Sequence, residues 1–110
     1  MAIAHASSGD VIHAIALGNE LRETPSHALL KGSHLELIRL IMPAGKVMKD
    51  HRVSGEVTIH CLEGVLELST LDKTQTLQAG DLVYLAGNEP HGLKAVMDAS
   101  VLLTISLTRQ

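Results

Sequence analysis

The sequence predicts one all-β domain, a sandwich or barrel of short antiparallel strands. Turn-forming residues recur roughly every eight to twelve positions, which is the spacing of such folds, and the apolar residues between them show no sustained helical period. With 110 residues, the chain is long enough for one hydrophobic core and too short for two. We therefore expect an irregular amino-terminal arm over residues 1–26 and a barrel over residues 27–110.

The arm has the least regular pattern, because Gly18 and Pro25 interrupt it. Residues 10–17 fit two local structures, and both stay open. Asp10 is a suitable cap for a helix, whereas the β-branched Val11 suits a short strand equally well. We expect at most one short strand in this part of the chain.

The first strands of the barrel are predicted from apolar runs that end at turns. Residues 28–31 run into a Gly-Ser pair, and residues 34–42 (HLELIRLIM) run into Pro-Ala-Gly. Residues 57–62 alternate between apolar and polar side chains. Gly64 joins them to residues 65–71, which predicts a hairpin.

The remaining strands follow the same rule. Residues 74–77 follow an Asp-Lys turn, and residues 82–85 lie between the turns at Gly80 and Gly87. Residues 100–106 alternate again and predict the last strand. No internal repeat, linker or low-complexity segment interrupts this series.

Two histidines have a fixed spacing from turn glycines, and this spacing carries a family resemblance. The stretch from residue 41 to residue 95 resembles the core of small single-domain cupins. Gly45, His51 and Gly64 match the first cupin motif, and Gly80 and His91 match the second. The resemblance implies an RmlC-like double-stranded β-helix, the jelly-roll barrel of cupins.

The chain departs from both motifs. Val53 and Val57 occupy the positions of the second histidine and the glutamate of the first motif. In the second motif, Ala86, Asn88 and Ala95 replace the proline, glycine and asparagine. Asn88 is a mild change, because asparagine tolerates positive φ better than other residues with a side chain.

The resemblance implies a divalent transition metal inside the barrel, and here His51 and His91 are its candidate ligands. Two imidazoles alone hold such a metal weakly. Glu56 and His60 are the nearest substitutes for the lost ligands, but strand alternation points them to the outer face. A bulge near Gly55 would shift the register by one residue and turn both inward.

Two functions are compatible with these residues, and whether the protein is an enzyme stays open. The first is a binding module, in which an interior pocket with the two histidines at its rim captures a small, partly apolar acid without transforming it. The alternative is a metal-dependent cupin enzyme, of the dioxygenase or isomerase type, acting on a small oxygenated substrate. The expected pocket lining is Met42, Val53, Val57, Ile59 and Tyr84.

Composition excludes several other classes. The net charge is −3 and the nine Lys and Arg are scattered, which argues against a nucleic-acid face or a basic membrane patch. The chain has one Tyr and no Phe or Trp, so recognition by aromatic stacking is not expected. No apolar stretch has the length of a membrane span or a secretory signal.

The single cysteine and the family resemblance complete the expectations. Cys61 cannot form an intrachain disulfide, and a position in an apolar strand makes it an inert core thiol. We therefore expect a cytoplasmic protein. The resemblance also implies a homodimer, and the irregular amino-terminal arm is one segment that could cross to a partner subunit.

Overall fold

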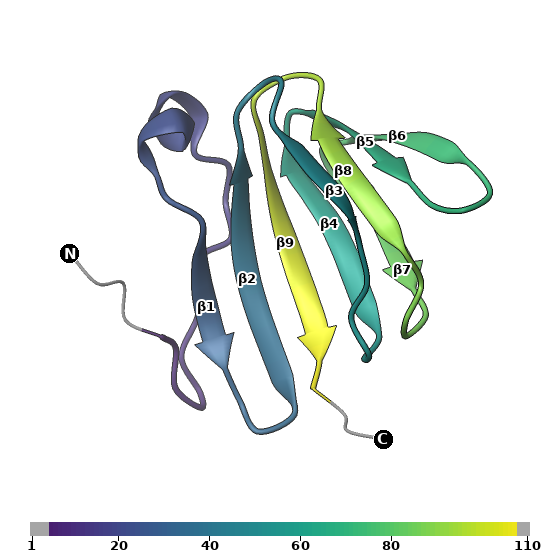
Figure 1. The fold of residues 1–110 in the computed structure, drawn as a ribbon. Helices are drawn as coiled ribbons and strands as arrows, with labels where there is room; N and C mark the ends of the chain where they lie inside the picture. The colour runs from purple at the N-terminus through teal and green to yellow at the C-terminus, as the bar shows by residue number, and fades with distance from the viewer. Residues whose placement is uncertain (1–4, 108–110) are drawn as a thin grey trace.

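The computed structural model describes residues 5–107, and of Asp50 and His51 it describes the backbone only. The described part folds into two antiparallel sheets that face each other and enclose one core (Figure 1). The predicted all-β, single-domain jelly-roll architecture is confirmed. The described residues contain no helix that is both long and apolar enough to cross a membrane.

The larger sheet has five strands and the smaller sheet has four. In spatial order, the larger sheet consists of β1 (His27–Lys31), β2 (Leu35–Met42), β9 (Ala99–Ser106), β4 (Val57–Glu63) and β7 (Leu82–Leu85). The smaller sheet consists of β3 (Val47–His51), β8 (His91–Ala95), β5 (Val65–Ser69) and β6 (Thr74–Gln78).

Alternation along the strands places one face of each sheet in the core. In β4, Val57, Ile59 and Cys61 are buried, as the sequence predicts, while the residues between them are half-buried. The same alternation buries Leu66 and Leu68 of β5. Aliphatic side chains fill this core, because the chain has no Phe or Trp.

Two strands were not predicted, and they are the two that carry the histidines. The sequence pattern predicts no strand at residues 47–51 or 91–95, but they pair with each other as β3 and β8. Their sequences, VMKDH and HGLKA, contain Lys, Asp and Gly, which are depleted in strands. Pairing with neighbouring strands overrides these weak local preferences.

The amino-terminal arm contains a short helix in place of the expected strand. Residues Gly18–Glu23 form a 3₁₀-helix (η1), and residues 10–17 form neither of the two structures left open by the sequence. Leu21 anchors η1, because its side chain is buried. An ion pair between Arg22 and Asp98, with an Nε–Oδ2 distance of 2.8 Å, ties η1 to the turn before β9.

The arm packs against the outer face of its own larger sheet, next to β1 and β2 at the left of Figure 1. The Glu63 carboxylate accepts hydrogen bonds from the backbone N–H groups of Leu17 and Gly18, at 2.9 and 3.0 Å. The buried Arg39 donates to the carbonyl oxygen of Ile15. The described part of the arm, residues 5–26, therefore packs on its own chain.

The motif glycines occupy backbone conformations that residues with a Cβ atom rarely adopt. Gly45, Gly64 and Gly80 have φ angles of 90°, 85° and 95°. Asn88, which stands at the position of a motif glycine, has a φ of 65°. Asparagine therefore adopts a positive φ at this position, as expected from its tolerance for this conformation.

Candidate functional site at the barrel mouth

The candidate site lies at one end of the barrel, which we call the barrel mouth. Here β4 begins at Val57, β8 begins at His91 and β9 approaches its end at Ile105. Two connections that carry motif residues meet at this end, because the Asn88 N–H donates to the Val53 carbonyl at 2.7 Å. This hydrogen bond joins the loop that follows His51 to the loop that precedes His91.

His91 is the best-defined polar residue of the mouth. It faces the core together with Leu93, and only 5% of its surface is exposed. Its Nδ1 lies 3.1 Å from the carbonyl oxygen of Glu89. A carbonyl oxygen can only accept a hydrogen bond, so Nδ1 carries the proton. In the neutral ring, Nε2 is then the nitrogen that accepts a hydrogen bond or binds a metal.

The backbone of His51 is the direct cross-strand partner of His91. This register depends on an irregularity in β3 between Met48 and His51, where two residues lie opposite the single Gly92. The extra residue places His51, in place of Asp50, across from His91. The two histidines of the sequence motifs are therefore neighbours along the backbone of the smaller sheet.

The register change that the sequence suggested near Gly55 is not present. From Val57 onward β4 pairs with β7 and β9 without a shift until the stretch between Cys61 and Glu63. Glu56 is therefore exposed, and His60 lies half-buried on the outer face. Neither side chain lies beside His91 in the barrel.

Tyr84 is also outside the barrel, and the expectation that it lines the pocket is wrong. It pairs with Thr58 on the outer face, is 59% exposed, and donates a hydrogen bond from its hydroxyl to Glu56. This bond raises the pKa of the Tyr84 phenol. The strand LVYL is apolar throughout, so its sequence does not reveal which face is buried.

The other four expected lining residues belong to the core. Met42 and Ile59 are fully buried, and Met42 pairs with Ala99 at the end of the barrel opposite the mouth. Val57 is 4% exposed, whereas Val53 is half-buried and packs against the core from the mouth. Val53 also lines a surface hollow of about 430 Å³, and Val57 lines a smaller one of about 210 Å³ beside Tyr84.

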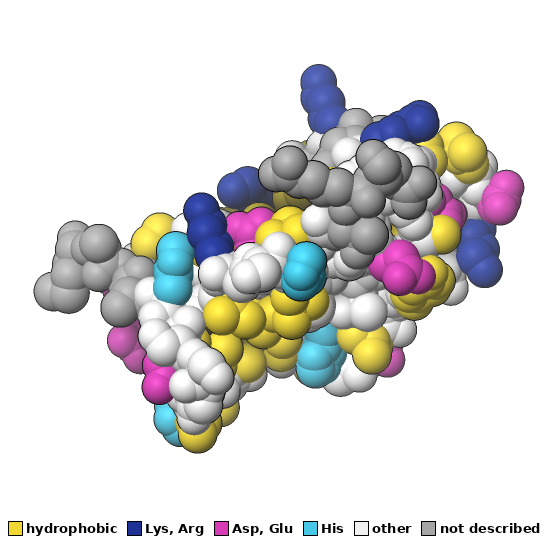
Figure 2. All heavy atoms as spheres, turned by 90° about the horizontal axis from the view of Figure 1, so that it is seen from below, with side chains coloured by type: hydrophobic (Ala, Val, Ile, Leu, Met, Phe, Trp, Pro, Cys, Tyr) yellow, Lys and Arg dark blue, Asp and Glu magenta, His cyan; other side chains and the backbone are white. Residues whose placement is uncertain are grey.

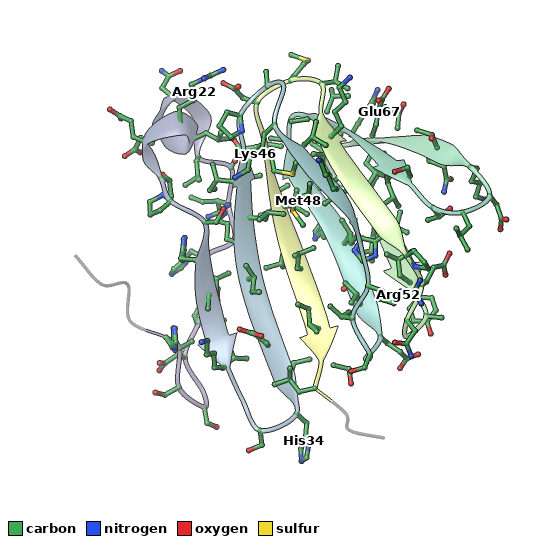
Figure 3. All side chains as sticks on the ribbon, in the orientation of Figure 1. Arg22, His34, Lys46, Met48, Arg52 and Glu67 are labelled. Atoms are coloured by element: carbon green, nitrogen blue, oxygen red, sulfur yellow. The ribbon has the colours of Figure 1, made fainter. Side chains whose placement is uncertain are left out.

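A partly exposed apolar surface continues from the core to the mouth. Its members pack against the buried cluster without being buried themselves, and they are Leu40, Met48, Val53, Leu103 and Ile105. Met48 points into the space between the sheets in Figure 3. Figure 2 looks at this end of the molecule and shows apolar side chains at its centre with histidines around them.

Glu36 is a functional candidate that the sequence did not reveal. It lies on the inner face of β2 and is the cross-strand partner of Ile105 on β9. Ile105 is in turn the cross-strand partner of Val57 on β4. A hollow of about 430 Å³ opens beside it between the β1–β2 turn, the β3–β4 loop and the end of β9. The mouth therefore does hold a carboxylate, two strands away from the family's glutamate position.

The described side chains do not complete a metal centre of the family type. Within residues 5–107, leaving aside the side chains of Asp50 and His51, no three His, Cys, Asp or Glu side chains are close enough to hold an ion together. Val53 and Val57 supply no ligand atom. With His51 counted, two imidazoles are available, which is fewer than a stable transition-metal site uses.

Cys61 behaves as the sequence predicts. Its side chain is fully buried, and burial raises the pKa of the thiol, with the hydrogen bond to the Glu63 carbonyl acting in the opposite sense. The thiolate is the reactive form, so a raised pKa leaves Cys61 inert.

Comparison with known proteins agrees with this architecture. The profile of the family described as "Cupin domain" matches residues 38–106, and no curated protein sequence matches the chain significantly. A conserved Streptococcus pyogenes protein of unknown function is 19% identical, with a TM-score of 0.74 and coverage of 100% of both chains.

Two other solved structures are similar in the same way. An RmlC-like cupin from Desulfovibrio desulfuricans is 23% identical, with a TM-score of 0.69, over 94% of this chain and 98% of the other. KdgF from Halomonas sp. is 19% identical, with a TM-score of 0.71, over 76% and 80% of the two chains. At such identities the likeness shows the fold alone.

Proposed function

Because the chain belongs to the cupin domain family, we propose that it binds a small, partly apolar carboxylic acid at the barrel mouth, with His91 as the polar anchor. The observation that carries this proposal is the inward-facing, almost fully buried imidazole of His91. The hydrogen bond from its Nδ1 to the Glu89 carbonyl orients the ring, and an imidazole held in this way can bind a carboxylate through a charge-assisted hydrogen bond. The apolar surface that includes Leu103 and Ile105 suits the rest of such a ligand.

The proposal predicts that straight-chain carboxylic acids bind through Nε2 of His91. We expect wild type to bind hexanoate, and His91→Asn to bind it about tenfold more weakly, as for loss of one charge-assisted hydrogen bond. The amide N–H₂ of asparagine can replace Nδ1–H at the Glu89 carbonyl but offers nothing at the position of Nε2. Isothermal titration calorimetry measures both affinities.

A matched control separates this effect from a general loss of histidine. His34 lies exposed at the β1–β2 turn (Figure 3), so His34→Ala is expected to bind hexanoate as wild type does. Equal affinity of wild type and His91→Asn, with both folded by circular dichroism, would contradict the proposal.

A divalent transition metal held by His51 and His91 is the second candidate, and the metal-dependent enzyme depends on it. The direct backbone pairing of the two residues favours it, and so does the orientation of the His91 ring. If this metal site exists, wild type binds zinc or manganese, and both His51→Ala and His91→Asn lose this binding. Equal metal affinity in the three proteins removes this candidate.

We also propose a homodimer through the outer face of the larger sheet. Leu35, Leu82 and Tyr84 are 40%, 62% and 59% exposed on this face, and a second copy can cover the patch by two-fold symmetry. Light scattering at micromolar concentration is expected to give twice the mass of one chain. Leu82→Glu should halve that mass, whereas Leu71→Glu, on the exposed β5–β6 turn, should not. A monomeric wild type contradicts the dimer.

A further inference from the structure

Glu36 is a half-buried carboxylate on the inner face of the larger sheet. It shares this face with Ile38, Leu40 and Met42, since β2 and β9 pair without a register shift from Leu35 to Met42. Its cross-strand partner, Ile105, packs against the core. The Glu36 carboxylate therefore lies on the side of β2 that faces the barrel interior, and it is only partly exposed to solvent.

The hollow beside Glu36 has the composition of a small-molecule site. Its lining combines apolar side chains with serine hydroxyls. Its described lining residues are Ser33, Glu36, Val53, Ser54, Gly55, Ile105, Ser106 and Leu107. Among these residues Glu36 is the only one with a charged side chain. Among the described lining residues, charge recognition therefore depends on that carboxylate.

The carboxylate of Glu36 is not neutralised by its neighbour across the strands. Lys31 is the cross-strand partner on β1, but it is exposed and the structure shows no ion pair between the two. Glu63, in contrast, accepts backbone N–H groups, and Glu56 accepts the Tyr84 hydroxyl. Glu36 thus differs from these two carboxylates: it faces a hollow, and none of the residues described in the structure forms an ion pair with it.

We infer that the ligand of the barrel mouth carries a primary ammonium group, which the Glu36 carboxylate binds. The inference rests on the proposed function for the other end of the ligand, the carboxylate at His91. An ammonium group satisfies a partly desolvated carboxylate through charge-assisted hydrogen bonds. The ligand class is then a small amino acid whose amine and carboxylate stand at opposite ends of a short aliphatic chain.

The separation of the two anchors sets the length of this chain. Glu36 lies on the larger sheet and His91 on the smaller, and facing sheets are about 10 Å apart, side chains included. Because the two residues lie on different sheets, we test linear amino acids of several lengths around this spacing. We take 6-aminohexanoate as the central probe, with 4-aminobutanoate and 8-aminooctanoate on either side.

The test compares acids with and without the amine. We expect wild type to bind 6-aminohexanoate about tenfold more tightly than hexanoate, the gain of one charge-assisted hydrogen bond. Glu36→Gln, which keeps the shape of the side chain, should abolish this gain and leave hexanoate affinity unchanged. Glu56→Gln removes a carboxylate from the outer face and should leave both affinities unchanged.

The outcomes distinguish this inference from the proposed function. Equal affinity of wild type and Glu36→Gln for all three amino acids overturns the amine site, even if hexanoate still requires His91. Hexylamine gives an independent reading, because it has no carboxylate: binding to wild type that is lost in Glu36→Gln supports the amine site even if the acid proposal fails. Equal hexylamine affinity in the two proteins counts against it.

Discussion

Replacing Gly64 with alanine is expected to destabilise the protein by about 3 kcal/mol or more, through backbone strain plus overpacking. Gly64 has a φ of 85°, and a Cβ atom there would lie 2.0 Å from the Asp98 carbonyl oxygen and 2.7 Å from the Cα of Ala99. Both contacts are with backbone, so no side chain can move aside. Urea unfolding of Gly64→Ala, followed by circular dichroism, measures the loss.

Gly80→Ala provides the matched comparison. Gly80 has a similar φ of 95°, but a Cβ atom there would meet nothing within 4 Å. We expect a loss of about 1 kcal/mol, the cost of the backbone conformation alone. Equal losses of stability in the two variants would contradict this account. They would mean that the close approach of the β4–β5 turn to the start of β9 adds nothing to the cost of Gly64→Ala.

Replacing Glu63 with glutamine is expected to cost about 2 kcal/mol at neutral pH, because the charged acceptor of several hydrogen bonds is lost. The carboxylate receives N–H groups from Leu17 and Gly18 and the hydroxyl of the buried Ser100. Urea unfolding at pH 7 measures the change. Glu67→Gln is the control, since Glu67 is half-buried on the smaller sheet and the described residues give it no hydrogen bond.

The same carboxylate gives the stability a pH dependence. Burial tends to raise the pKa of Glu63, but the hydrogen bonds from Ser100 and the arm, with the charge of Arg39, lower it overall. A lowered folded-state pKa stabilises the fold above the unfolded-state value, about 4.3 for Glu. The stability difference between wild type and Glu63→Gln should therefore stay constant near pH 7 and shrink below about pH 4. A difference that grows on acidification would contradict this.

The frame of the barrel could be predicted because its signals are local. The three motif glycines require positive φ, and the alternation of β4 assigns Val57, Ile59 and Cys61 to the core. These signals depend on single residues or on one strand. They do not depend on which strands become neighbours.

The site could be predicted only in part, because its residues depend on long-range pairing. β3 and β8 have little strand propensity of their own, so the pairing of His51 with His91 was not evident. Both faces of β2 carry mostly apolar side chains. The outer face does so because the amino-terminal arm covers it near Arg39 and Ile41. Alternation along β2 therefore does not show that Glu36 faces the barrel.

The most direct test of the central claim, that a ligand binds at the barrel mouth, is an NMR titration of ¹⁵N-labelled wild type with hexanoate and 6-aminohexanoate. Saturable shifts are predicted at the backbone amides of Val53, His91 and Ile105, with Glu36 responding to the amino acid. Shifts that gather on the outer face around Leu82 and Tyr84, or no saturable shifts with either probe, would contradict it.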